Sequence, residues 1–245
     1  MRKIKLTIEY DGTNYHGWQI QKNASSVQET IERAIYKLLG NKAGVVGCSR
    51  TDVGVHAYGQ VAHFVTDFDI PGEKFSYALN NLLPDDIVIR KSEEVDEDFH
   101  SRYSAKGKKY RYLIYNEAHA SAIMRKRTCH VRPELDFEEM RAAAEFFAGQ
   151  HDFAAFQATG GQVRSTVREI YSIGVVKNED NIIGIEVSGS GFLYNMVRII
   201  AGTLIYVGMG KIKADEIPAI IESLDRTKAG KTAPAEGLYL MEIYY

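Results

Sequence analysis

The residues best suited to chemistry lie in one short segment, residues 47–57, which reads GCSRTDVGVHA. The carboxylate of Asp52 follows the cation Arg50 by two residues and precedes Gly54 by two. Apolar residues on both sides predict strands, so the segment is a loop that presents Asp52 to substrate. Such a carboxylate can act as nucleophile or general base, and Arg50 can bind an anionic substrate or keep Asp52 ionised. The structural alternative is an Asp that only closes an Asx-turn beside Gly54.

Further motifs run in order along nearly the whole chain. They are YDGT and GWQ at 10–13 and 17–19, FHSR at 99–102, KYRY at 109–112, HDF at 151–153 and GFLYNMVR at 191–198. Together with segment 47–57, they resemble the tRNA pseudouridine synthase A family, whose loop motif is G-R-T-D-A-G-V-H-A. Ser49 and Val53 replace the Gly and Ala of that motif. Each motif alone is weak, but the ordered set is specific to the family.

The resemblance implies an isomerase that converts uridine to pseudouridine in the anticodon stem-loop of tRNA, at positions 38, 39 and 40 in the family. The base leaves ribose at N1, turns and reattaches through C5, so the reaction requires no cofactor or metal. The chain accordingly has no phosphate-binding G-x-x-x-x-G-K-[ST] motif and no G-x-G-x-x-G turn. The partner implied is tRNA, and the resemblance also implies a homodimer.

Four site residues follow from the resemblance. Asp52 is the catalytic carboxylate; whether it attacks the base, attacks the sugar or removes a proton from the sugar is open, and each route needs it ionised. Arg198 corresponds to the family's active-site arginine, and an ion pair with Asp52 would oppose the rise in pKa that burial causes. Tyr110 matches the tyrosine that lies against the target base, although a strand aromatic often only fills the core. Arg50 is the candidate to fill the stack when the uridine is extruded.

Several other residues have two readings each. His56 either contacts a phosphate or is a hydrogen-bonded structural residue, which is the commoner role for a histidine beside a strand. Trp18, the only tryptophan, either contacts RNA or covers the edge of a domain. Cys48 and Cys129 lie far apart without a C-x-x-C partner, so we expect free thiols and neither a disulfide framework nor a zinc site.

The charge balance excludes a uniformly basic surface, because 30 Lys and Arg residues face 32 Asp and Glu residues at a pI of about 6.4. Basic residues nevertheless gather at 106–111, 125–127 and 164–168, while acidic residues gather at 93–98 and 134–139. This separation is compatible with one RNA-binding face, since phosphate binding needs only a local basic surface. For each cluster alone, an ordinary solvated face is the simpler interpretation.

The hydrophobic periodicity predicts the same order of elements in both halves of the chain, namely strand, helix, two strands, helix and strand. In the first half these are strands around 4–10, 45, 61 and 87–89 with helices at 27–38 and 75–82. In the second half they are strands at 110–115, 167–176 and 182–187, helices at 137–147, 195–207 and 215–224, and a closing strand at 238–244; a polar turn at 177–181 joins two of the strands. The pattern predicts an α+β protein of two ferredoxin-like (RRM-like) domains, residues 1–104 and 105–245. The resemblance implies the pseudouridine synthase fold, in which the two antiparallel sheets join around a central cleft.

No apolar run approaches the roughly 20 residues of a membrane helix, and no signal-peptide core follows Met1, so we expect a cytoplasmic protein. Two other functions remain as alternatives. A non-catalytic RNA-binding protein of paired RRM-like domains would use the aromatic strand 109–115, but leaves Asp52 unexplained. A carboxylate-nucleophile hydrolase or phosphatase would act on small molecules through Asp52, but such phosphatases usually carry a second Asp two residues after the nucleophile, where this chain has Gly54.

Overall fold

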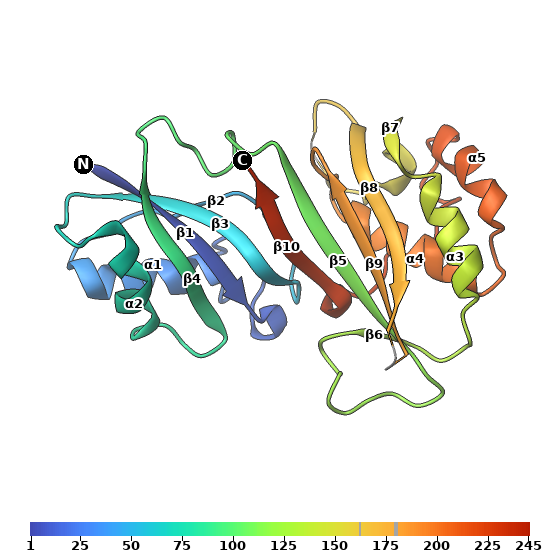
Figure 1. Cartoon of the computed structure of the whole chain (residues 1–245), viewed down its shortest axis with the longest axis horizontal. Helices are drawn as coiled ribbons and strands as arrows, with labels where there is room; N and C mark the ends of the chain where they lie inside the picture. Colours follow the sequence, from blue (N-terminus) through green and yellow to red (C-terminus); the bar gives the residue numbers. More distant parts are fainter. Residues whose placement is uncertain (162, 179–180) are drawn as a thin grey trace. The chain divides into compact units, whose positions relative to one another are not determined.

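The computed structural model describes residues 1–161, 163–178 and 181–245. The chain forms two compact units, which we call unit 1 (Met1–Lys106 with Tyr239–Tyr245) and unit 2 (Gly107–Leu238). Both are built from antiparallel strands with helices packed on them, which confirms the predicted α+β class (Figure 1).

Unit 1 contains β1 (Arg2–Tyr10), α1 (Val27–Leu39), β2 (Val46–Gly47), β3 (His56–Thr66), α2 (Phe75–Asn80), β4 (Ile87–Val95) and β10 (Leu238–Tyr244). Its strands lie in the order β4-β1-β3, and both β2 and β10 pair with β3. The pairing of β1 with β3 and β4 is antiparallel, whereas β10 runs parallel to β3. The order of strands and helices in unit 1 is that of a ferredoxin-like domain.

The ends of α1 follow directly from local sequence. Ser26 accepts a hydrogen bond from the backbone N–H of Glu29 at 3.2 Å, and Gly40 ends the helix with a left-handed φ of 73°. The apolar residues Val27, Ile31, Ala34 and Ile35 form the buried face. The helix that the periodicity predicts at 27–38 is therefore confirmed.

Unit 2 contains β5 (Gly107–Asn116), β6 (Cys129–Val131), α3 (Phe137–Glu145), β7 (Gly149–Asp152), β8 (Val167–Lys177), β9 (Ile182–Gly189), α4 (Met196–Gly208) and α5 (Ile217–Glu222). The antiparallel order is β5-β9-β8-β7, with β6 parallel to β5. The short strands β6 and β7 were not predicted, and the predicted turn at 177–181 lies partly outside the described residues. None of the helices in the described parts of the chain is long and apolar enough to cross a membrane.

Almost all of strand β10 belongs to unit 1, because its residues make their contacts there. The domain boundaries inferred from the sequence placed this strand in the second domain. Its register joins Tyr239 to His56 and Leu240 to Ala57, at the start of β3. The division into domains 1–104 and 105–245 stays a prediction.

The buried His63 of β3 should make the stability of the protein depend on pH. Its side chain is buried on β3, and burial, followed by the charges of His100 and Lys3, lowers its pKa from 6.5 to about 4. Between pH 6.5 and about 4, His63 is protonated in the unfolded chain but neutral in the folded chain. The free energy of unfolding therefore decreases as the pH falls through this window. At pH 5 the free energy of unfolding should be about 2 kcal/mol lower than at pH 7.

Urea unfolding of the wild type and of His63→Gln at the two pH values measures this loss. Gln keeps an acceptor for the backbone N–H of Ser101, which donates to His63 Nδ1 at 3.2 Å. An equal loss in both proteins would assign the pH dependence to other groups.

Candidate active site

Asp52 lies in the loop between β2 and β3, half-buried, as the sequence predicts. The backbone N–H of Val55 donates to the carbonyl of Asp52 at 3.2 Å, and Gly54 has a left-handed φ of 78°. A glycine adopts this conformation without strain, so the chain turns sharply directly after Asp52. The backbone carbonyl of Asp52 closes this turn.

A second segment of unit 1 packs against the loop. We call four of its residues the clamp, namely Tyr10, Tyr15, Gly17 and Trp18. The Tyr10 hydroxyl lies 2.7 Å from Thr51 Oγ1, and the backbone N–H of Trp18 donates to the Thr51 carbonyl at 3.1 Å. The Gly54 N–H donates to the Tyr15 carbonyl at 3.4 Å. The clamp therefore binds the chain on both sides of Asp52, and its rings Tyr10 and Trp18 are themselves buried.

Gly17 is the position where the clamp tolerates no side chain. Its φ is 85°, and a Cβ built on it would lie 2.4 Å from the carbonyl oxygen of Thr51. The close approach of the two backbones thus explains why position 17 is a glycine.

The other end of the loop is fixed by Gln60 of β3, which is fully buried. Its Nε2 donates to the Ser49 carbonyl at 2.8 Å, and its Oε1 accepts from the Ser49 N–H at 3.2 Å. The sequence did not single out Gln60; the available signal was an amide in a strand whose neighbours Val61 and Ala62 are apolar. Ser49 Oγ itself is buried without a hydrogen-bond partner in the described part of the chain.

Arg50 is exposed and forms no ion pair with any residue that the structure describes. The hypothesis that it holds Asp52 ionised therefore gains no support from an observed contact. Its exposure is instead what contact with an RNA substrate requires.

The contacts of His56 and Trp18 favour the structural reading of each residue. His56 is buried, accepts a hydrogen bond from the Gly12 N–H at 3.1 Å and stacks on Tyr239 with ring centroids 4.8 Å apart. Trp18 is 2% exposed and packs against Gly47, where a Cβ would lie 2.3 Å from its Nε1. Both residues support the loop from inside the unit.

Tyr110 lies on β5 in unit 2, opposite Val187 of β9, with 9% of its surface exposed. Its ring meets Phe192 edge-on at 5.3 Å between centroids. The neighbouring cations Lys109 and Arg111 both pair with Glu186, and these bonds lower the pKa of that carboxyl. Glu186 therefore offsets part of the positive charge that the sequence places beside Tyr110.

Arg198 lies in the first turn of α4, half-buried, on a helix whose residues are almost all buried. Its Nε donates to the Ala233 carbonyl at 2.8 Å, and its Nη1 donates to Asn195 Oδ1 at 2.8 Å. These bonds fix the direction of the guanidinium. Asp52 and Arg50 belong to unit 1, while Tyr110 and Arg198 belong to unit 2, so the Asp52–Arg198 ion pair stays a prediction.

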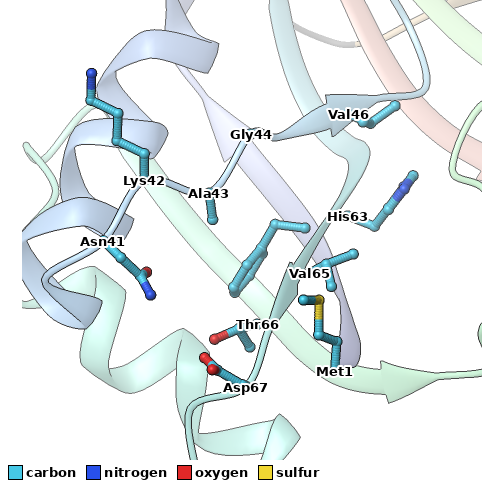
Figure 2. Close-up of a pocket in the computed structure, with 11 residues that line it drawn as sticks. Met1, Asn41, Lys42, Ala43, Gly44, Val46, His63, Val65, Thr66 and Asp67 are labelled. Carbon is cyan, nitrogen blue, oxygen red and sulfur yellow. The ribbon is translucent and has the colours of Figure 1, made fainter.

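A separate cavity of about 380 Å³ lies at the far end of β3 (Figure 2). It is lined by Met1, Asn41, Lys42, Ala43, Gly44, Val46, His63, Phe64, Val65, Thr66 and Asp67. At ~3.3 Å per strand residue, His63 is roughly 20 Å along β3 from His56, where the Asp52 loop ends. This cavity contains none of the four predicted site residues.

By fold and site, this protein is an α+β protein with a half-buried carboxylate in a loop that neighbouring residues hold on both sides. A family model described as tRNA pseudouridine synthase matches residues 6–104 and 143–245. The chain is 78% identical over its full length to tRNA pseudouridine synthase A of Ruminiclostridium cellulolyticum and 63% identical to that of Acetivibrio thermocellus, and in both cases all of each chain is covered. The chain therefore belongs to the tRNA pseudouridine synthase family, which confirms the resemblance stated from its motifs.

Proposed function

We propose that the protein converts uridine to pseudouridine in the anticodon stem-loop of tRNA, at positions 38, 39 and 40, with Asp52 as the catalytic nucleophile or base. The observation that carries the proposal is the Asp52 loop, in which the family's motif coincides with a carboxylate held on both sides by buried residues. Such fixation serves catalysis because a reacting group must keep its geometry throughout the reaction.

The reaction breaks the N1–C1′ bond and forms a C5–C1′ bond, so substrate and product are isomers. The hydrogen at C5 leaves as a proton and N1 gains one, which balances the reaction without an external donor. Asp52 acts either by attack on the base or sugar or by taking a proton from the sugar, and each route uses its ionised form.

The remaining predicted residues take roles that suit their surroundings. Arg198 would pair with Asp52 and favour the ionised carboxylate, and its guanidinium is already oriented by Ala233 and Asn195. Tyr110 would lie against the target base, supported by Phe192. Arg50, exposed beside Asp52, would stack into the gap left by the extruded uridine.

The partner in this proposal is tRNA, and the protein acts as a homodimer in the cytoplasm, where its substrate is found. No cofactor or metal takes part. The alternatives, a non-catalytic RNA-binding protein or a carboxylate-nucleophile hydrolase, are less favoured because neither accounts for the membership of the whole chain in a synthase family.

The test is tritium release from tRNA transcripts labelled at uracil C5, incubated with the wild-type protein and no added cofactor or metal. We expect rapid release from a transcript with uridines at 38, 39 and 40, and none when cytidines replace them. Binding without release would favour the RNA-binding alternative, and release that persists after replacement would place the target elsewhere.

A further inference from the structure

The motif Phe99-His100-Ser101-Arg102 has no role in the reaction described so far, yet unit 1 holds it firmly. Ser101 is fully buried, and its N–H donates to His63 Nδ1 at 3.2 Å. Its hydroxyl donates to the Val46 carbonyl at 2.6 Å, while its own carbonyl accepts from the Tyr245 hydroxyl at 2.7 Å. The segment is thus fixed to β2, to β3 and to the residue that follows β10.

The next residues close a tight turn on this anchor. The Ser104 N–H donates to the His100 carbonyl at 2.9 Å, and the His100 N–H donates to Ser104 Oγ at 3.0 Å. His100 Nδ1 accepts from the N–H groups of Arg102 and Tyr103, each at 3.2 Å. These bonds fix the imidazole ring and place its remaining proton on Nε2.

Three rings form a column from the core to the surface. The buried ring of His63 lies 5.0 Å from that of His100, edge to face, and the ring of Tyr103 stacks on His100 at 4.3 Å between centroids and 30° between planes. Tyr103 is nevertheless 79% exposed. The ring of Tyr103 is therefore supported on one face by His100 and remains accessible to solvent.

We infer that Tyr103, supported by His100, is a stacking platform for an unpaired base of the RNA substrate. An exposed, pre-ordered ring suits a base because every base has a flat π-face, and little ordering entropy remains to be lost on binding. The exposed acids Asp96, Glu97 and Asp98 precede the turn and disfavour a phosphate at this place, so the occupant is a base. Arg102 precedes Tyr103, is exposed and forms no ion pair among the described residues, so its guanidinium is free to approach the backbone of the bound strand.

The inference rests on the proposed function only in taking RNA as the substrate. Binding of an unlabelled tRNA transcript is measured on the Asp52→Asn protein, with and without Tyr103→Ala. Loss of one stacked base weakens binding by about 10-fold or more. Tyr103→Phe retains the ring and should restore wild-type affinity.

Tyr77 on α2 provides the matched control, since it is 69% exposed and also lies beside a cation, Lys74, 5.3 Å from its ring. Tyr77→Ala should leave tRNA affinity unchanged. A fully paired RNA duplex should bind Tyr103→Ala and its parent equally, because it offers no open base. The dependence of affinity on salt should also be unchanged by Tyr103→Ala, as stacking releases no counterions.

Equal tRNA affinity of Tyr103→Ala and Tyr77→Ala would overturn the platform. So would a change in oligomeric state by sedimentation, which would make Tyr103 part of a protein interface. The two proposals fail separately. A wild type that binds tRNA in a Tyr103-dependent way without tritium release would overturn the synthase proposal and leave the platform; normal release with unchanged Tyr103→Ala binding would do the reverse.

Discussion

Substitution of Asp52 by Asn should reduce tritium release from C5-labelled tRNA by about 10⁴-fold or more, the scale seen when a catalytic nucleophile is removed. Asn has nearly the same shape as Asp. Hydrogen bonds of Thr51, Ser49 and Gly54 hold the loop, and the substitution leaves these bonds in place. The variant should therefore fold and bind tRNA with wild-type affinity while it lacks the negative charge that each chemical route requires.

Asp67→Asn serves as the control because Asp67 is exposed at the opposite end of β3. It should release tritium at the wild-type rate. Release by Asp52→Asn within a few-fold of the wild type would keep a synthase but remove Asp52 from the reaction.

Substitution of Gly17 by Ala should damage both stability and turnover. The left-handed φ of 85° costs an alanine about 1 kcal/mol or more, and the 2.4 Å approach of its Cβ to the Thr51 carbonyl oxygen forces the backbone before Asp52 to move. Together we expect the free energy of unfolding to fall by about 3 kcal/mol. The rate should fall more than tRNA affinity, because a displaced reacting group costs catalysis first.

The substitution Gly40→Ala separates the effect of backbone strain from the effect of the contact with Thr51. Gly40 has a similar φ of 73°, but nothing lies within 4 Å of a Cβ built there. It should therefore lose about 1 kcal/mol of stability through backbone strain alone and keep full activity. Equal stability losses and equal rates in the two variants, by urea unfolding and tritium release, would show that the contact with Thr51 has no consequence for the loop.

Features that depend on neighbouring residues were predictable from the sequence. The cap at Ser26, the stop at Gly40 and the buried face of α1 follow from local rules, as does the apolar α4. Helix α2 ends at Asn80, before the predicted Leu82, and the chain tightens there, because the Leu82 N–H donates to the Leu79 carbonyl three residues back at 2.9 Å. Local patterns thus locate elements well and their ends less well.

Features that depend on contacts between distant residues were not predictable. Gln60 reads as one polar residue in a strand, and only the folded chain shows that it holds Ser49. The cations Lys109 and Arg111 read as a basic cluster, and only the pairing of β5 with β9 brings Glu186 to them. The short strands β6 and β7 have too few residues for a periodic pattern, so neighbouring strands define them.

The position of β10 in the chain has a consequence for biosynthesis. This strand leaves the ribosome only after all of unit 2, yet it pairs with β3 at His56 and Ala57, directly after the Asp52 loop, and supplies Tyr239 to the ring of His56. During translation, the edge of β3 beside the loop therefore remains unpaired with β10 until the end of unit 2 has been synthesised. We expect the loop to reach its final order late in synthesis, so that catalytic competence is timed by the arrival of the last strand and not by the early appearance of Asp52.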